Sequence, residues 1–405
     1  MKRPRSCFTC CAALVILTVA TAAASADDGG GGWSGGAVPF VNYDADAGFG
    51  AGAIGSLSLH RPHAAPHRAS FLLQAFVSSE RVQAHELRWD VVLPSHPGLR
   101  VFGRAAYFAS VNRNYCGLGN AVTCDPAVAE AAADAAGLAM GSDARADFVR
   151  HYHHVRFLAG TFHLGARWRT GRRALSGFAQ WRALYIQPGT WRDRGPYPGS
   201  MYATDHPDGE PGLISAPQVG VMFDTRDSET IPSRGRWLEA SLRGGGTVTG
   251  SAWSFLGGNV SARLYHGVAP GVVSATRLVA DGLAGSPPVA ELGQVNAAES
   301  YVAFGGQSAG RGIREHRFIG AIKLLAQEEL RVQLSRRWVG VGFVDAGWIA
   351  VDWDRVGGDP ARVLWSTGAG LRHVRNSGFI LRADVGVSPI EGWTPQLYLY
   401  LGHLY

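Results

Sequence analysis

The sequence predicts an all-β fold, a transmembrane antiparallel β-barrel of about sixteen strands. Three observations predict it. Apolar and polar residues alternate in runs of roughly ten from Val38 onward. Short turns alternate with long connections rich in glycine and proline, and the last residue, Tyr405, is aromatic. Outer-membrane barrels carry short turns at one end, long loops at the other, and aromatic residues where the wall meets the membrane surface.

The N-terminus predicts export. Basic residues precede an apolar run from Cys10 to Ala24, and small residues follow that run. This is the pattern of a cleaved signal peptide, which we place over residues 1–26. The run is shorter than the roughly 20 residues that a spanning helix needs. We assign residues 27–37 to a short periplasmic leader and residues 38–405 to a barrel in the outer membrane of a Gram-negative cell.

The charge balance excludes nucleic acid as a partner. The chain carries 38 lysines and arginines against 32 acidic residues, for a formal net charge of +6. Part of that excess lies in the signal peptide, so no basic surface of the kind that binds nucleic acid is expected. Almost all of the positive residues are arginines, which suit fixed carboxylate pairs or phosphate-bearing head groups. Outer-membrane lipid or lipopolysaccharide is therefore an expected partner.

The exported part of the chain has two cysteines, Cys116 and Cys124. An even pair in an exported chain favours a disulfide that closes one small loop. A metal or redox site is the alternative, but no clustered ligands accompany the pair. We expect no metal and no cofactor.

The alternation that predicts strands is clearest in the second half of the chain. In residues 379–388, Leu381 and Val385 fall on one face, and Arg382 and Asp384 fall on the other. One such face suits lipid and the other suits a polar lumen. A soluble β-sandwich would give the same alternation in a single strand, so the loops and the chain end have to decide between the two folds.

The connections have the asymmetry of an outer-membrane barrel. Short turns lie at residues 94–98, 169–173, 231–235 and 374–378. Long polar connections lie at residues 112–148, 189–213, 286–319 and 352–363. The long connections predict the extracellular end of the barrel.

The end of the chain predicts a closing strand. Leu397, Leu399, Leu401 and Tyr405 share one face of the alternation, and Gly402 belongs to the same strand. Tyr405 is expected to lie in the aromatic girdle at the membrane interface. A soluble domain does not explain an exported chain whose last strand stops at such a residue.

Several short motifs occur in order along the chain. They are YCGLGN (Tyr115–Asn120), DTRDSETIPSRGRWLEASL (Asp224–Leu242), FGGQSAGRGI (Phe304–Ile313), EELRVQL (Glu328–Leu334), GFVDAGWI (Gly342–Ile349) and STGAGLR (Ser366–Arg372). Together with the final LGHLY, this ordered set resembles the barrel domain of the outer-membrane protein insertase and translocase superfamily, the BamA/TamA-like or bacterial surface antigen family.

The resemblance implies that one extracellular loop, residues 286–319, folds into the lumen with Arg311 at its tip. Strand alternation points Glu329 and Asp345 into the lumen. We therefore expect Arg311 to bridge these two carboxylates and to hold the loop as a latch. An exposed Arg311 in a mobile loop is the alternative.

The same segment has two other interpretations. Gly306, Ser308 and Gly310 form a GxSxG pattern, which in a hydrolase needs a strand before it and a helix after it. The glycines could also cradle a phosphate, which again requires a helix N-terminus. The residues after Ser308 predict a strand rather than a helix, so we assign Gly310 and Gly312 to a tight backbone approach around Arg311.

Two further clusters were considered as sites. Asp224, Arg226 and Asp227 could be catalytic, but Pro232 and Gly235 mark the segment as a turn with lumen-facing residues. His151 and His153 share one face of a predicted strand, a spacing that can bind metal, but no third ligand is predictable. A polar rim is the preferred interpretation of the histidines, and no enzyme is expected.

By resemblance, the first strand (Val38–Asp44) and the last strand would meet in a weak seam that opens laterally and assists insertion or translocation of membrane proteins or lipids. Client outer-membrane proteins or a separate periplasmic protein would be the partners. Two departures from the family pattern are expected to matter. Ile313 stands where an aromatic is characteristic, and the few residues before Val38 leave no room for POTRA domains. No fused lipase domain is predicted either.

The resemblance leaves other functions open. The first alternative is a passive or lipid-handling outer-membrane channel, or a surface-structural protein without insertase activity. An outer-membrane phospholipase or protease is the third possibility.

Overall fold

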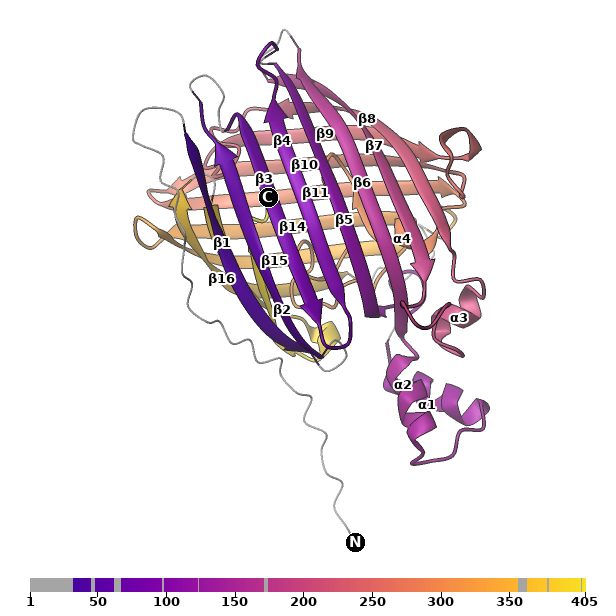
Figure 1. The fold of residues 1–405 in the computed structure, drawn as a ribbon. Helices are drawn as coiled ribbons and strands as arrows, with labels where there is room; N and C mark the ends of the chain where they lie inside the picture. Colours follow the sequence, from indigo (N-terminus) through magenta and orange to yellow (C-terminus); the bar gives the residue numbers. More distant parts are fainter. Residues whose placement is uncertain are drawn as a thin grey trace.

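The computed structural model describes residues 32–44, 48–61, 67–96, 98–122, 124–170, 174–355, 363–376, 379–401 and 403–405. The predicted signal peptide, most of the predicted leader and Gly402 lie outside this range. Sixteen antiparallel strands form one sheet that curves into a barrel (Figure 1). The predicted fold class is confirmed.

Each strand of the sheet pairs with the next one along the chain, apart from the small strands β12 and β13 between β11 and β14. The bounds are β1 Trp33–Asp44, β2 Gly48–Leu59, β3 Ala69–Ser78, β4 Gln83–Val92, β5 Leu99–Asn114, β6 His154–Arg169, β7 Leu175–Pro188, β8 Gly212–Asp224, β9 Gly235–Gly245, β10 Phe255–Ala269, β11 Val272–Gly285, β14 Ile322–Gln333, β15 Trp338–Ala350, β16 Leu364–Asn376, β17 Phe379–Val387 and β18 Gln396–Leu401. The first strand thus begins earlier than the predicted Val38.

The wall of the barrel has the polarity of a membrane protein. In β14, Lys323 and Glu329 are fully buried, whereas Leu324 and Leu330 are each 46% exposed. The same alternation recurs in β9, where Leu242 is 60% exposed and its neighbours Ser241 and Arg243 are buried. Polar side chains therefore face the lumen and apolar ones face lipid.

Three helices, α1 Pro126–Ala135, α2 Asp143–His151 and α3 Met201–Asp205, lie at the end of the barrel opposite the predicted short turns (Figure 1). The fourth, α4 Val289–Leu292, belongs to the connection between β11 and β14, and short 3-10 turns lie at Thr247–Thr249 and Pro389–Glu391. None of the helices formed by the described residues has the length and hydropathy of a membrane span. We call this end of the barrel the helix end.

The predicted strand around His151 and His153 is wrong. His151 is the last residue of α2, and β6 begins only at His154. The helix forms because the Ser142 side chain accepts a hydrogen bond from Arg145 N, which caps its N-terminus. The two histidines therefore do not share a strand face.

The connection between β11 and β14 folds into the lumen. It carries α4 and a small hairpin formed by β12 (Gln294–Asn296) and β13 (Ser300–Val302). Phe304 and Ile313 of this connection are fully buried in one apolar cluster with Ile349 of the wall. Ile313 thus packs where the family resemblance predicts an aromatic side chain. We call residues 286–321 the inner loop.

The end of the chain does not follow the prediction. β18 ends at Leu401, and Tyr405 is buried inside the barrel. Its hydroxyl donates to Ala275 O over 2.8 Å, and its ring packs with Tyr265. Tyr405 therefore lies against β10 and β11 rather than in a lipid-facing girdle, because a hydroxyl partner and apolar contacts are available in the lumen. Within the described residues, no ladder of hydrogen bonds joins β1 to β18.

Candidate functional site

The side chain of Arg311, from the inner loop, is fully buried against the lumenal wall. Its Nη1 donates to Glu329 Oε1 of β14 over 2.7 Å and to Asp384 Oδ2 of β17 over 3.1 Å. Its Nη2 and Nε donate to the two carboxylate oxygens of Asp345 in β15, each over 3.0 Å. One guanidinium therefore joins the loop to three strands of the wall.

The cluster around Arg311 extends through shared carboxylates. Arg331 Nε donates to Glu329 Oε2 over 2.9 Å, and Arg372 Nη2 donates to Glu329 Oε1 over 3.2 Å. Arg372 also pairs with Asp384, and Arg382 lies 3.5 Å from Asp384. We call this set the Arg311 cluster: Arg311, Arg331, Arg372, Arg382, Glu329, Asp345 and Asp384. Its carboxylates are fully buried.

The contribution of such a cluster to stability depends on every buried charge having its partners. Burying charges costs several kcal/mol per ion unless partners and hydrogen bonds compensate. The Arg311 guanidinium also lies over the ring of Phe343, 3.4 Å from its centroid, which adds a cation–π contact. Loss of one partner would leave an uncompensated buried charge, at a cost of about 3–5 kcal/mol.

Two glycines permit the close approach of the loop to the wall. Gly312 has a φ of +99°, and a Cβ added there would lie 2.4 Å from Val387 N. A Cβ on Gly386, in β17, would lie 2.5 Å from the backbone of Arg311. Gly312 N also donates to the Tyr398 hydroxyl of β18 over 2.9 Å. The backbone of the loop thus touches the backbone of the wall beside Arg311.

A second charged cluster holds the beginning of the inner loop. Glu291 of α4 is fully buried, accepts from Arg243 Nε of β9 over 2.9 Å, and pairs with Arg182 of β7. Arg243 also donates to both oxygens of Asp281 in β11, and Lys323 Nζ of β14 donates to Asp281 Oδ1 over 2.9 Å. We call these five residues the Glu291 cluster.

The Glu291 cluster keeps its central carboxylate ionised. Burial by itself raises the pKa of Glu291. The nearby guanidiniums of Arg182 and Arg243 lower this pKa by more than burial raises it, to about 2. Lys323 Nζ also donates to Gln294 O of the loop over 2.8 Å. The loop is therefore held at two places, by Glu291 near its start and by Arg311 near its end.

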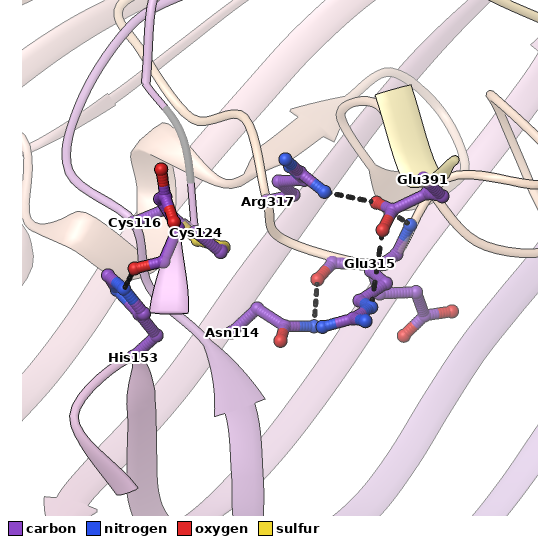
Figure 2. Close-up of a disulfide and its surroundings, with 9 residues drawn as sticks. Asn114, Cys116, Cys124, His153, Glu315, Arg317 and Glu391 are labelled. Atoms are coloured by element: carbon purple, nitrogen blue, oxygen red, sulfur yellow. Dashed lines mark hydrogen bonds and ion pairs between the residues drawn. A yellow bond between two sulfur atoms is a disulfide. The ribbon is translucent and has the colours of Figure 1, made fainter. Parts of the chain in front are cut away.

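The outer part of the inner loop is tied to neighbouring connections at the helix end. Arg317 Nη1 lies 2.8 Å from Glu391 Oε1, and Asn114 Nδ2 donates to Glu315 O over 2.9 Å (Figure 2). Arg113 donates to His316 Nδ1 over 3.1 Å. Burial and Arg113 hold the pKa of His316 well below its usual range, so the ring stays neutral and accepts that bond.

Cys116 and Cys124 form a disulfide beside this part of the loop (Figure 2). Their Cα atoms are 5.2 Å apart, within the range that a disulfide spans. The bond closes the segment between the end of β5 and the start of α1. At its edge, His153 Nε2 donates to Asp125 O over 3.2 Å.

The predicted turn motif lies at the short-turn end of the barrel. Arg226 forms two hydrogen bonds with the carboxylate of Asp224, at 3.0 and 2.8 Å. Asp227 accepts from Ser233 N and Arg234 N, and these bonds lower its pKa despite the opposing effect of burial. Gly235 has a φ of +99° where β9 begins, and Pro232 is buried in the turn. These residues shape the turn.

No hydrolase geometry surrounds Ser308. Turns follow it, and then β14, whereas a nucleophile elbow requires a helix. Arg277 donates to the backbone oxygen of Ser308, which fixes the segment as part of the loop. In the part of the chain that the structure describes, no group of three or more His, Cys, Asp or Glu side chains is arranged to hold a metal ion.

Several partners within the two clusters were not predicted from the sequence. The two-residue period places Asp384 on a lumen-facing side of its strand, and the same signal was available for Arg372, but it does not show that either residue joins Arg311. Glu291 had no such signal, because α4 is a four-residue helix, too short to show a period, within an otherwise irregular connection. Its partner Arg243 lies on the buried face of β9, so alternation was the signal available for that residue. Within the predicted closing strand, Leu397 is exposed on the outer face, while Gly402 lies outside the described residues.

Residues 158–391 match a family model described as the Omp85 superfamily domain. That range contains both charged clusters and the whole inner loop. No curated protein matches the chain in sequence.

Three solved structures have a similar fold. CdiB from Escherichia coli has a TM-score of 0.57 and 14% identity over 91% of this chain and 62% of that one. BamA from Haemophilus ducreyi lacking POTRA domains 1–3 has a TM-score of 0.50 and 13% identity over 91% and 69%. CdiB from Acinetobacter baumannii has a TM-score of 0.50 and 12% identity over 91% and 59%. The similarity to these proteins is one of fold, and this chain spans less than two thirds of either CdiB chain.

Proposed function

The chain belongs to the Omp85 superfamily, and on that basis we propose that it is an outer-membrane barrel that assists the insertion or translocation of membrane proteins or lipids. The proposal places it in the Gram-negative outer membrane, exported by a cleaved signal peptide. Its sites are structural and gating residues, and no catalytic residue is assigned.

The observation that carries the proposal is the position of the Arg311 cluster. It binds the inner loop to β14, β15 and β17, the strands that lead to the end of the chain. Gly312 N reaches β18 itself through the Tyr398 hydroxyl. The loop is thus attached to the part of the wall next to the edge formed by β18.

The arrangement of that edge supports a seam that can open. β1 pairs with β2 along twelve residue pairs, from Trp33 to Asp44. β18 spans only Gln396–Leu401, and Tyr405 turns into the lumen. A strand as short as β18 offers few backbone hydrogen bonds to its neighbours, so an incoming strand can compete for this edge. A client outer-membrane protein is the proposed partner there, and a separate periplasmic protein is the proposed source of clients.

A reconstitution assay tests this function. Liposomes containing the purified barrel, and empty liposomes, are mixed with a urea-denatured client barrel whose folding is followed by its heat-modifiable gel mobility. We expect faster client folding with the barrel, and loss of that acceleration in Arg311→Ala. Asp352→Asn, which changes a half-exposed carboxylate that belongs to neither cluster, serves as the matched control and should behave as the unmodified protein. Equal client folding in empty and loaded liposomes would contradict the proposal.

A passive channel is the second candidate. A lumenal cavity of about 400 Å³ lies among the first ten strands and is lined by Arg88, Arg104 and Arg263. Ala298 and Ser300 of the inner loop also line it. Arginines around a pore favour anions. Ion conductance across a planar bilayer, without any effect on client folding, would favour this function over the first.

A further inference from the structure

A second cavity, of about 570 Å³, lies at the helix end of the barrel. The turn between β3 and β4, the end of α2, the start of β6 and the connection after β7 form its walls. Four arginines line it: Arg81, Arg150, Arg156 and Arg192. We call it the outer-rim cavity.

The outer-rim cavity belongs to the outside of the wall. In β6, Arg156 shares its face with Phe162 and Leu164, both of which are exposed toward lipid. Trp191, also a lining residue, is 60% exposed, and its ring lies 6.2 Å from that of Tyr107 of β5. Tyr107 shares the outward face of β5 with Ala109, which lines the cavity. The cavity therefore faces the membrane side of the barrel.

The position of the cavity along the barrel axis matches the outer surface of the membrane. Arg156 and the exposed Trp168 lie on the same face of β6, about a dozen residues apart, which is roughly 40 Å of strand. A tilt of about 40° leaves roughly 30 Å along the barrel axis, slightly more than the apolar band of about 25 Å. Exposed Tyr185 and Trp191 mark the edge of that band nearest the helix end. Arg156 therefore lies at the level of the lipid head groups.

Most of the cavity's positive charge is unpaired. Arg156 lies 3.7 Å from Asp193 and over the ring of Tyr197, 4.6 Å from its centroid. In contrast, no described carboxylate lies within ion-pair distance of Arg81, Arg150 or Arg192, all of which are exposed. Arg81 holds a φ of +64°, an uncommon backbone conformation for a residue with a side chain.

The acids that line the cavity do not neutralise these arginines. Asp193 pairs with Arg156, and Asp147 pairs with His151 over 3.3 Å. Glu80 also lines the cavity. The four arginines of the cavity outnumber its three carboxylates, and three of those arginines have no carboxylate partner among the described residues, so the site favours an anion with several oxygens.

We propose that the outer-rim cavity binds the phosphate group of an anionic lipid in the outer leaflet, as found on the phosphorylated sugar of lipopolysaccharide. Guanidiniums bind phosphate oxygens in pairs, and the aromatic residues below them contact the start of the acyl chains. The opening onto the lipid-facing wall selects a lipid over a soluble anion. The proposal depends on the barrel lying in the outer membrane and not on its activity toward clients.

The test uses the full chain in neutral-lipid nanodiscs and measures its affinity for lipopolysaccharide. The variant carries Arg81→Gln, Arg150→Gln and Arg192→Gln. The matched control carries Arg234→Gln, Arg336→Gln and Arg337→Gln, which removes the same charge from exposed arginines at the short-turn end. Because the variant removes three guanidiniums that can donate charged hydrogen bonds to phosphate, we expect it to lose affinity about tenfold or more. The control should bind as the unmodified protein does.

Two further probes identify the ligand chemistry. Dephosphorylated lipopolysaccharide should bind the unmodified protein as weakly as the intact lipid binds the variant, and millimolar inorganic phosphate should not displace the intact lipid. Equal loss of affinity in variant and control, equal binding of the dephosphorylated lipid, or full displacement by inorganic phosphate would each overturn the assignment. Heat-modifiable gel mobility shows that all three proteins are folded, so that loss of binding is not loss of the barrel.

Discussion

Arg311 and Asp345 are joined by three hydrogen bonds to one carboxylate. The backbone N–H, Nε and Nη2 of Arg311 each donate across 3.0 Å. The backbone bond fixes the position of the chain at residue 311 as well as the orientation of its guanidinium. This distinguishes the pair from an ordinary side-chain ion pair, in which the loop would keep its own freedom.

Removal of the charge on Asp345 should release the inner loop. Asp345→Asn keeps the size of the side chain but leaves the Arg311 guanidinium with less compensation in a fully buried site. We expect the free energy of unfolding to fall by about 3 kcal/mol, and the loop to become open to added protease. Urea unfolding in detergent and limited proteolysis measure the two effects. Asp352→Asn, at a half-exposed position outside the cluster, should change neither.

A methyl group at Gly312 should prevent the close approach of loop and wall. Gly312→Ala combines a φ of +99° with a Cβ 2.4 Å from Val387 N, and we expect a loss of about 3 kcal/mol. Gly137→Ala is the matched control, since Gly137 has a φ of +70° and no atom within 4 Å of the added Cβ. The control should lose no more than about 1 kcal/mol. Equal losses in both proteins would mean that backbone strain, and not contact with β17, decides the effect.

Acid should loosen the start of the inner loop. The pKa of Glu291 falls from an ordinary 4.5 to about 2 in the folded protein. A depressed carboxyl pKa stabilises the fold above the unfolded value, so this contribution is present above about pH 4.5 and is lost as the pH falls toward 2. The protection of residues 289–296 from hydrogen exchange, measured against the rate of an unstructured chain at the same pH, should therefore decrease over that window.

The Glu291→Gln variant separates this effect from general acid unfolding. It should exchange quickly at neutral pH already, and its exchange should change less between pH 5 and pH 2. An unmodified protein whose loop keeps the same protection, relative to an unstructured chain, across the window would exclude Glu291 as the pH-sensitive group.

Loss of the disulfide should act locally. The bond between Cys116 and Cys124 closes a short segment, and replacing both cysteines by serine should cost about 2–3 kcal/mol in the ordering of that segment. The expected result is faster hydrogen exchange in residues 115–125, with unchanged exchange in the strands of the barrel. A drop in the free energy of unfolding of the whole barrel would contradict this, because it would show that the disulfide stabilises more than the segment between β5 and α1.

The sequence was sufficient for the wall and for part of the site. The two-residue period places Glu329 and Asp345 in the lumen, because alternation alone decides which face a strand residue occupies. It could not show that Asp384 joins them, since this depends on the curvature of the sheet and on where the loop descends. Glu291 lies in a four-residue helix, too short to show a period, so its burial could not be anticipated.

The end of the chain shows the limit of pattern reasoning most clearly. The alternation continues through Tyr405 and predicts a longer last strand with a lipid-facing aromatic residue. In the structure the ring is buried and its hydroxyl reaches Ala275 O. A sequence pattern identifies which residues tolerate lipid. It does not show that a residue can make a hydrogen bond and ring contacts inside the barrel instead, as Tyr405 does with β10 and β11.

The two attachments of the inner loop grip different arcs of the barrel. Glu291 holds β7 and β9, and Arg311 holds β14, β15 and β17. The loop thus ties the two ends of the arc from β7 to β17 together, and that arc cannot widen while both charged anchors hold. The anchors leave the edge between β18 and β1 free, so any opening of the wall is directed to that edge, and the weaker anchor sets how much force the tied arc withstands.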